Sequence, residues 1–217
     1  MLGVTRQSLR AALLDLTAEG LVERIPNRGA RVRVVTMDEA VAITECRMAL
    51  EALCAVKAAQ HITDDDAARL RELGGELRRA VAERDPLKYS ELNRELHRRV
   101  GAISGQAVAV GLLARLHAQI VRHQFQLALR PGRPEQSLAE HLAIIDAIAG
   151  RRPDDAGEAV RRHLNSVIDA LRAAGDATGR AAGETTAEAA GAAARDTTEL
   201  AAEETTGVAA GEAGQPV

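Results

Sequence analysis

The sequence predicts a mainly α-helical protein, in which one helix and a two-stranded hairpin precede an all-helical bundle. Hydrophobic residues make up 46% of the chain but aromatic residues only 1%. The core must therefore consist of Ala, Leu, Val and Ile, which suits helix-on-helix packing. Alternation of apolar and polar residues is confined to the segment before residue 36. Helix-capping motifs and helical periodicity follow it as far as residue 173.

The segment before residue 36 begins with a predicted helix over residues 5–19, which places Leu9, Leu13 and Leu16 on one face. Gly20 occupies the usual position after a helix C-terminus. The segments LVER and ARVRVV then alternate with period two and are joined by the turn IPNRG, which predicts a β-hairpin. A helix followed by a hairpin is the second half of a winged helix-turn-helix. Residues 1–35 are therefore predicted to form a partial winged-helix domain.

Capping motifs mark the helices of the predicted bundle. Thr36 and Glu39 form a capping box, and TDDD from Thr63 provides a second N-cap. The SGQ break, the turn RPGRP and the stretch from Gly150 to Pro153 separate the later helices. Helix 36–61 is apolar on several sides, which predicts that it is buried and contributes to a subunit interface. The predicted helices cover residues 36–61, 63–84, 86–102, 107–129, 135–149 and 154–173.

Charge is distributed unevenly along a chain whose formal net charge is −3. The segment from Arg6 to Arg33 holds six arginines and three acidic residues, a local charge of +3. Residues 174–217 hold eight acidic residues and two arginines, a local charge of −6. Their Ala, Gly, Thr and Glu composition predicts a disordered tail. The basic segment is thus the candidate nucleic-acid surface, and residues 36–173 form a second, helical domain.

The sequence also predicts the compartment. No apolar run approaches the roughly 20 residues of a membrane span, and no signal peptide is visible. Cys46 and Cys54 lie eight residues apart in a predicted helix. At ~1.5 Å per residue they are about 12 Å apart along its axis, too far for a disulfide. We expect a cytoplasmic protein with reduced thiols and no membrane partner.

Three predicted helices each direct a histidine toward the core. His97 lies with Asn93 at the inner edge of an apolar stripe, His141 lies within the face of helix 135–149, and His163 lies on the inner side of the last helix. Such histidines can be ordinary core residues with a hydrogen-bond partner. Alternatively, three imidazoles and an amide oxygen form a site for a divalent ion such as zinc, nickel, manganese or iron. His117 is predicted near solvent, and His123 as a residue that lines a pocket.

The residues LGVTRQSLRAALLDLTAEGLVERIPNRGARV resemble the second half of the winged helix in GntR-type bacterial transcription regulators. The segments ECRMALE, NRELH, SGQ and EHLAIIDAI resemble the FCD ligand-binding domain of the FadR-like branch of that family. The resemblance covers residues 2–172. It implies a DNA-binding regulator, usually a repressor, that works as a homodimer.

The resemblance also implies a metal site made of Asn93, His97, His141 and His163, in which Asn93 replaces the more usual aspartate. The metal would offer an open position to a small carboxylate effector. Arg47 is the candidate second anchor for that carboxylate, and His123 also lines the effector pocket. The alternative for Arg47 is a salt bridge to Glu51, four residues later in the same helix.

For DNA, the resemblance implies a recognition helix that enters the major groove from its N-terminal end. The residues expected to touch DNA are Thr5, Arg6, Gln7 and Arg10 of the helix and Asn27, Arg28 and Gly29 of the wing. The two helices that precede this half in the family have no counterpart in the sequence. Either the true start of the protein lies upstream, or the protein is naturally truncated. If it is truncated, we expect the N-terminal unit to be weakened, because Leu9, Leu13 and Leu16 would lose packing partners.

Two other functions are consistent with the same residues. One is a metal-dependent enzyme acting on a small organic acid, since three histidines and an oxygen also describe a hydrolytic or lyase site. Helical-wheel positions argue against it, because they direct no second carboxylate into the pocket and turn Glu140 away from it. The other is an effector-binding or dimerisation module without DNA binding, which would pair with an intact relative.

Overall fold

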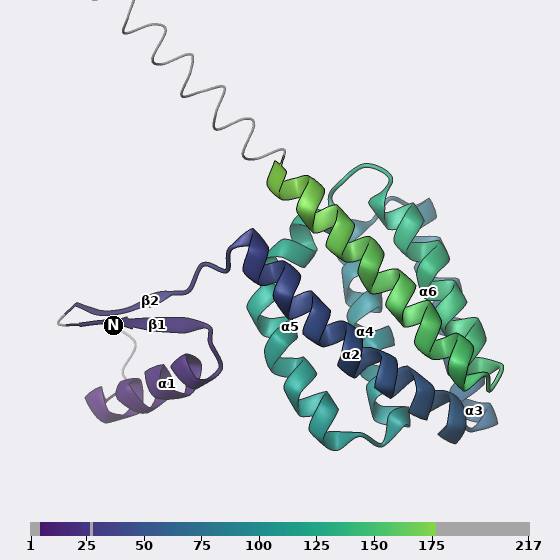
Figure 1. Cartoon of the computed structure of the whole chain (residues 1–217), viewed down its shortest axis with the longest axis horizontal. Coiled ribbons are helices and arrows are strands. Elements are labelled where there is room, and N and C mark those ends of the chain that lie inside the picture. The colour runs from purple at the N-terminus through teal and green to yellow at the C-terminus, as the bar shows by residue number, and fades with distance from the viewer. Residues whose placement is uncertain (1–4, 27, 177–217) are drawn as a thin grey trace, which may run out of the picture. The chain divides into compact units, whose positions relative to one another are not determined.

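The computed structural model describes residues 5–26 and 28–176. The N-terminal unit consists of α1 (Arg6–Ala18) and the antiparallel strands β1 (Val22–Ile25) and β2 (Gly29–Val32), shown in purple in Figure 1. Thr5 caps α1, because its side chain accepts a hydrogen bond from the Ser8 amide. The strands pair with Val22 opposite Val32. The predicted helix and hairpin are confirmed.

Six helices follow the hairpin within the described residues. The two predicted threonine caps are present: Thr36 accepts from the Glu39 amide at 3.2 Å, and Thr63 accepts from the Asp66 amide at 3.1 Å. Gly105 ends α4 in the left-handed conformation at φ 69°, which glycine adopts without steric cost. The helices are α2 (Met37–His61), α3 (Asp64–Ala82), α4 (Pro86–Ser104), α5 (Ala107–Ala128), α6 (Arg133–Ala149) and a last helix over residues 153–176.

The core of the bundle is made of small and branched aliphatic side chains. α2 packs against α4 and α5, and α3 packs against α4 and α6. α2 contributes mainly alanines to this core, and their small side chains allow neighbouring helices to approach closely. The prediction that α2 is buried is therefore confirmed for one face, whereas Ala42, Cys46, Ala49 and Leu53 are exposed, and the predicted subunit interface stays a prediction. Leu70, Leu77, Leu96 and Leu164 are completely buried, and a leucine-to-alanine change at such a site costs about 2–5 kcal/mol.

The N-terminal unit is packed differently. α1 has no buried residue, and Leu9 and Leu16 are 51% and 36% exposed. The predicted tail from residue 177 onward lies outside the described residues. Both cysteines are free, as expected. Along the described part of the chain, we find no helix with the length and apolar character needed to cross a membrane.

Candidate metal centre

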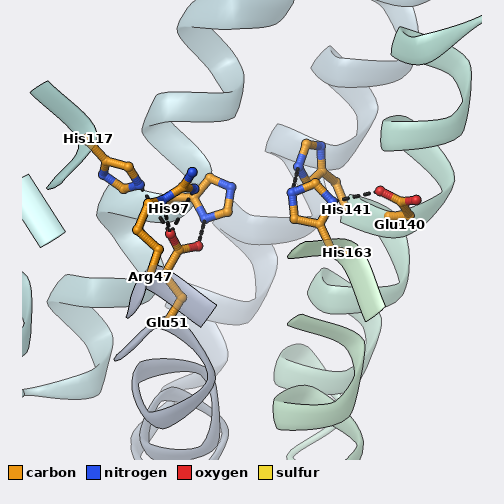
Figure 2. Close-up of polar contacts among 7 residues, drawn as sticks. All are labelled: Arg47, Glu51, His97, His117, Glu140, His141 and His163. Carbon is orange, nitrogen blue, oxygen red and sulfur yellow. Dashed lines mark hydrogen bonds and ion pairs between the residues drawn. The ribbon is translucent and has the colours of Figure 1, made fainter. Parts of the chain in front are cut away.

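Histidines from α4, α6 and the last helix meet in the interior of the bundle (Figure 2). One ring nitrogen from each of His97, His141 and His163 lies within 4.8 Å of the others. His141 and His163 are almost fully buried, whereas 14% of the His97 side chain is exposed. The Nε2 atoms of His141 and His163 are 3.3 Å apart. The structure therefore brings together the three histidines that the sequence selected.

The second ring nitrogen of each histidine contacts an oxygen. His163 Nδ1 lies 2.7 Å from Glu140 Oε2, and His97 Nδ1 lies 2.9 Å from Glu51 Oε2. His141 Nδ1 lies 3.0 Å from the Tyr89 hydroxyl. For His163 and His141 the contact is a hydrogen bond, and an Nδ1–H that donates to an oxygen fixes the tautomer in which Nε2 carries the lone pair. The His97 contact is an ion-pair contact by distance, because among the described residues Glu51 Oε2 has no hydrogen-bond partner. The three Nε2 atoms are thus left as candidate ligands.

The protonation of the buried pair suits a metal ligand. Burial lowers the pKa of His141 well below its usual value, and the nearby His163 lowers it further. Burial also lowers the pKa of His163, with His97 as the next cause. Both imidazoles are therefore neutral at pH 7, and only a neutral imidazole can coordinate a metal.

Two further observations fit a divalent ion. Asn93 Oδ1 is buried and has no hydrogen-bond partner within the described residues. A buried amide oxygen without a partner is costly, and a metal ion would satisfy it. In addition, two nitrogens bound at 2.0–2.1 Å to one tetrahedral zinc ion would be about 3.3 Å apart, which matches the observed 3.3 Å between His141 and His163. The donor set is thus suited to a metal.

Glu51 is the centre of a buried charge cluster beside His97. Its Oε1 lies 2.8 Å from Arg47 Nη2 and 3.1 Å from His117 Nε2. Burial alone would raise the pKa of Glu51, but the charges of Arg47 and His97 hold it well below its usual value. The alternative expectation for Arg47, a salt bridge to Glu51, is therefore present. Among the residues that the structure describes, Arg47 Nη1 nevertheless has no hydrogen-bond partner.

Several members of this network are not evident from the sequence. Glu140 is within reach of His163, although its helical-wheel position had turned it away, and Glu51 reaches both His97 and His117. The expectation that no second carboxylate converges on the site is therefore wrong. A helical wheel gives the direction of a side chain only relative to its own helix, whereas these glutamates contact histidines on other helices. A usable signal was present at Tyr89, which lies four residues before Asn93 on the same face.

A small cavity of about 60 Å³ adjoins the histidines. It is lined by two guanidinium groups, and within the part of the chain that the structure describes each has a nitrogen without a hydrogen-bond partner: Nη1 of Arg47 and Nη2 of Arg133. Arg133 Nη1 donates to Ser166 Oγ at 2.6 Å, and its Nη2 is 3.5 Å from Glu140 Oε2. His123 lies elsewhere, because its Nε2 contacts the Val35 carbonyl at 2.9 Å. The structure thus differs from the prediction that His123 lines the effector pocket.

The residues predicted to touch DNA lie on the N-terminal unit. Thr5 caps α1 by accepting the Ser8 amide, while Arg6, Gln7 and Arg10 are exposed on that helix. Arg28 is exposed in the turn of the hairpin, and Gly29 has a φ of 95°. Asn27 lies outside the described residues. The arrangement presents basic and amide side chains at the start of α1 and at the tip of the hairpin.

Comparison with known proteins places this architecture in a family. Residues 42–166 match the FCD domain, and residues 1–32 match the gntR family of bacterial regulatory proteins. The chain is 27% identical over 169 residues to the HTH-type transcriptional repressor RspR of Escherichia coli, covering 78% of this chain and 74% of the relative. It is 28% identical over 196 residues to the transcriptional repressor NanR of Cronobacter sakazakii, covering 78% and 72%.

Solved structures of other proteins share the fold of this chain. McbR/YncC of E. coli superimposes with a TM-score of 0.67 at 19% identity, covering 75% of this chain and 82% of that one. A GntR protein of Streptococcus agalactiae superimposes with a TM-score of 0.53 at 26% identity, covering 77% and 83%. The match to the FCD domain extends over more than half of the sequence, and the winged-helix match directly precedes it. The chain therefore belongs to the GntR family of transcriptional regulators and carries an FCD domain.

Proposed function

We propose that this chain is a cytoplasmic, homodimeric repressor whose DNA affinity is controlled by a small carboxylate bound at a divalent-metal site. In this proposal residues 1–35 contact the operator and residues 36–173 bind the effector. Relatives named as repressors, RspR and NanR, support the direction of regulation. The observation that carries the proposal is the convergence of three imidazoles whose Nδ1 atoms are all in contact with oxygens.

The proposed ligands are His97, His141, His163 and Asn93. When bound, the metal would offer a coordination position to a carboxylate oxygen. Zinc, nickel, manganese and iron all accept such a donor set. Because Asn93 supplies a neutral oxygen in place of a carboxylate, the site should bind these ions more weakly than an aspartate version would. Tyr89, Glu51 and Glu140 keep the imidazoles oriented.

A carboxylate at this centre would find positive charge nearby. Arg47 and Arg133 border the small cavity, and each has one guanidinium nitrogen with no hydrogen-bond partner in residues 5–26 and 28–176. Arginine pairs with carboxylates through parallel N–H groups, which adds orientation as well as energy. Arg133 is the stronger anchor in this proposal, because Arg47 is already paired with Glu51 at 2.8 Å.

DNA would be contacted by the N-terminal unit. Arg6, Gln7 and Arg10 are exposed on α1, in the position of a recognition helix, where Arg and Gln side chains read G and A edges. Thr5 would face the phosphates from the cap position, and the wing residues Asn27, Arg28 and Gly29 would approach the backbone or minor groove. A module without DNA binding is the alternative, and a gel-shift assay with the full chain distinguishes the two.

A homodimer is consistent with the surface of α5. Two pairs of large apolar side chains on this helix and its C-cap are exposed by 41–79%: Val108 and Leu112 near the N-terminus, and Phe125 and Leu129 at the C-terminal end. Exposed apolar residues that cluster in this way are typical of a protein interface. Regulation, and not catalysis, is favoured because Glu51 and Glu140 both contact the outer nitrogens of the histidines, which leaves neither free as a general base.

Metal content of the purified chain tests the proposal. We expect about one divalent ion per chain, retained in the control His61→Ala, an exposed histidine at the end of α2, and lost in His97→Ala and His141→Ala. Elemental analysis gives the stoichiometry, and circular dichroism verifies that the variants remain folded. A chain that takes up no zinc, nickel or manganese after reloading would contradict the proposal.

A further inference from the structure

A cavity of about 420 Å³ lies beside the candidate metal centre, with most of its lining on α4 and α5. It shares Asn93, His97 and Gln124 with the small cavity that contains the arginines. Its volume falls within the roughly 300–1,000 Å³ of small-molecule sites. The histidine cluster thus stands at the junction of a small polar cavity and a larger one.

The walls of the larger cavity are apolar along most of its length. They are formed by aliphatic side chains from α4, α5, α6 and the last helix, among them Leu96, Val100, Leu113, Val121, Ile144 and Val160. Beyond them Gly101 faces Val110, and a Cβ at Gly101 would lie 3.0 Å from Val110 Cγ2. Gly101 follows Asn93 by eight residues on α4, or ~12 Å along the axis. The cavity therefore has a polar end at Asn93 and His97 and an apolar end at Gly101.

The charges around this cavity favour an anion with one charged end. At the polar end Glu51 is already paired with Arg47 and His117, so it does not present an unpaired negative charge. Arg94 is exposed along its lining, where positive charge attracts anions. Arg98 also lines the cavity but is already paired with Glu95 at 2.7 Å. A polyhydroxylated acid would place hydroxyl groups against aliphatic walls that offer no hydrogen bond, which is costly.

We infer that the effector is a monocarboxylic acid with an apolar body, such as a medium-chain or arylalkyl acid, whose carboxylate lies at the histidines and whose body extends toward Gly101. This inference rests on the proposed function, because the carboxylate end is assigned to the metal centre. Burial of the body contributes up to about tenfold in affinity for every two methylenes. The affinity for an acid should therefore depend mainly on the length of its apolar chain.

Calorimetric titration of the zinc-loaded full chain tests the inference. Octanoate should bind at least about 100-fold more tightly than acetate, and more tightly than gluconate, while octanamide, which lacks the charge, should lose most of this affinity. Equal or tighter binding of gluconate would overturn the inference and leave the proposed function intact. If zinc binds but none of the acids does, both fail. Octanoate binding that survives in His141→Ala would support the apolar cavity and contradict the metal-bound carboxylate.

A cavity-filling variant provides a second, independent test. Ala114→Leu adds three carbons at an exposed position of α5 that lines the larger cavity, so the fold should tolerate it. It should weaken octanoate at least tenfold and leave acetate affinity and zinc content unchanged. Ala102→Leu, on the exposed side of α4 and outside the lining, is the matched control. Unchanged octanoate affinity in Ala114→Leu would overturn the inference.

Discussion

Two glutamates hold histidines of the same site, yet their surroundings shift their pKa values in opposite directions. Glu51 is 5% exposed and lies 2.8 Å from Arg47, and its pKa is lowered although burial acts to raise it. Glu140 is 18% exposed, its nearest guanidinium nitrogen is 3.5 Å away, and burial raises its pKa. The difference shows that a buried carboxylate stays ionised because of a close cation and not because of its histidine partner alone. Glu51 therefore stays ionised as the counter-ion of Arg47, whereas Glu140 is protonated more readily.

The largest expected effect comes from neutralising Glu51. Glu51→Gln leaves the buried Arg47 without its counter-charge, and we expect a loss of about 3–5 kcal/mol in the free energy of unfolding. Glu140→Gln is the matched comparison and should cost about 1 kcal/mol, because Arg133 keeps its bond to Ser166. Urea denaturation in the presence of a chelator measures both. Equal losses in the two variants would remove the distinction between the two carboxylates.

The pH dependence of stability separates the histidines from the glutamates. His141 and His163 have lowered pKa values in the folded state, so below about pH 6.5 the unfolded chain binds protons that the folded chain does not. Stability of the metal-free chain should thus fall as the pH drops from 7.5 to 5.5, by at most about 1.4 kcal/mol per pH unit for each histidine. Glu51 adds a loss only below about pH 4.5, whereas the raised pKa of Glu140 opposes that loss.

Thermal unfolding across this range, in buffer with a chelator, gives the slope. Burial also lowers the pKa of His117, so three histidines contribute to this slope. His163→Gln removes one of them and should flatten the curve between pH 7.5 and 5.5, while His61→Ala, at an exposed position at the end of α2, should leave that part unchanged. A melting temperature that is constant from pH 7.5 to 5.5 would contradict the neutral state of the buried histidines.

The smallest effect tests a third carboxylate, placed at position 93. Asn93→Asp introduces a negative charge where, among the described residues, the buried Oδ1 lacks a hydrogen bond. We expect the affinity for zinc to rise at least about tenfold, or about 1.4 kcal/mol, and the metal-free chain to become less stable because the charge loses its hydration. Competition with a zinc chelator measures the affinity, with Asn93→Ala as the control that lowers it. Unchanged affinity in Asn93→Asp would indicate that this side chain is not a ligand.

Much of the fold could be predicted because its signals are local. Threonine caps at Thr36 and Thr63 and the glycine at Gly105 fix helix ends through hydrogen bonds or backbone angles within a few residues. Helical periodicity likewise selected His97, His141 and His163, because an inward direction is a property of a single helix. The partners of these histidines could not be predicted in the same way. The contacts of Glu140, Tyr89 and Glu51 with these histidines depend on how helices distant in sequence pack together, and periodicity contains no such information.

The spacing of the site along the chain has a consequence for synthesis. Glu51 and Arg47 pair within one helix, so this pair can form as soon as α2 exists, whereas His163 lies 112 residues beyond Glu51 (163 minus 51). Chains emerge from the ribosome at about 5–20 residues per second. The Arg47–Glu51 pair is therefore synthesised several seconds before His163. The complete centre is therefore assembled only when the whole bundle can close. An incomplete translation product would carry the Arg47–Glu51 pair without the helices that bury it, and it could not bind a ligand at the histidines.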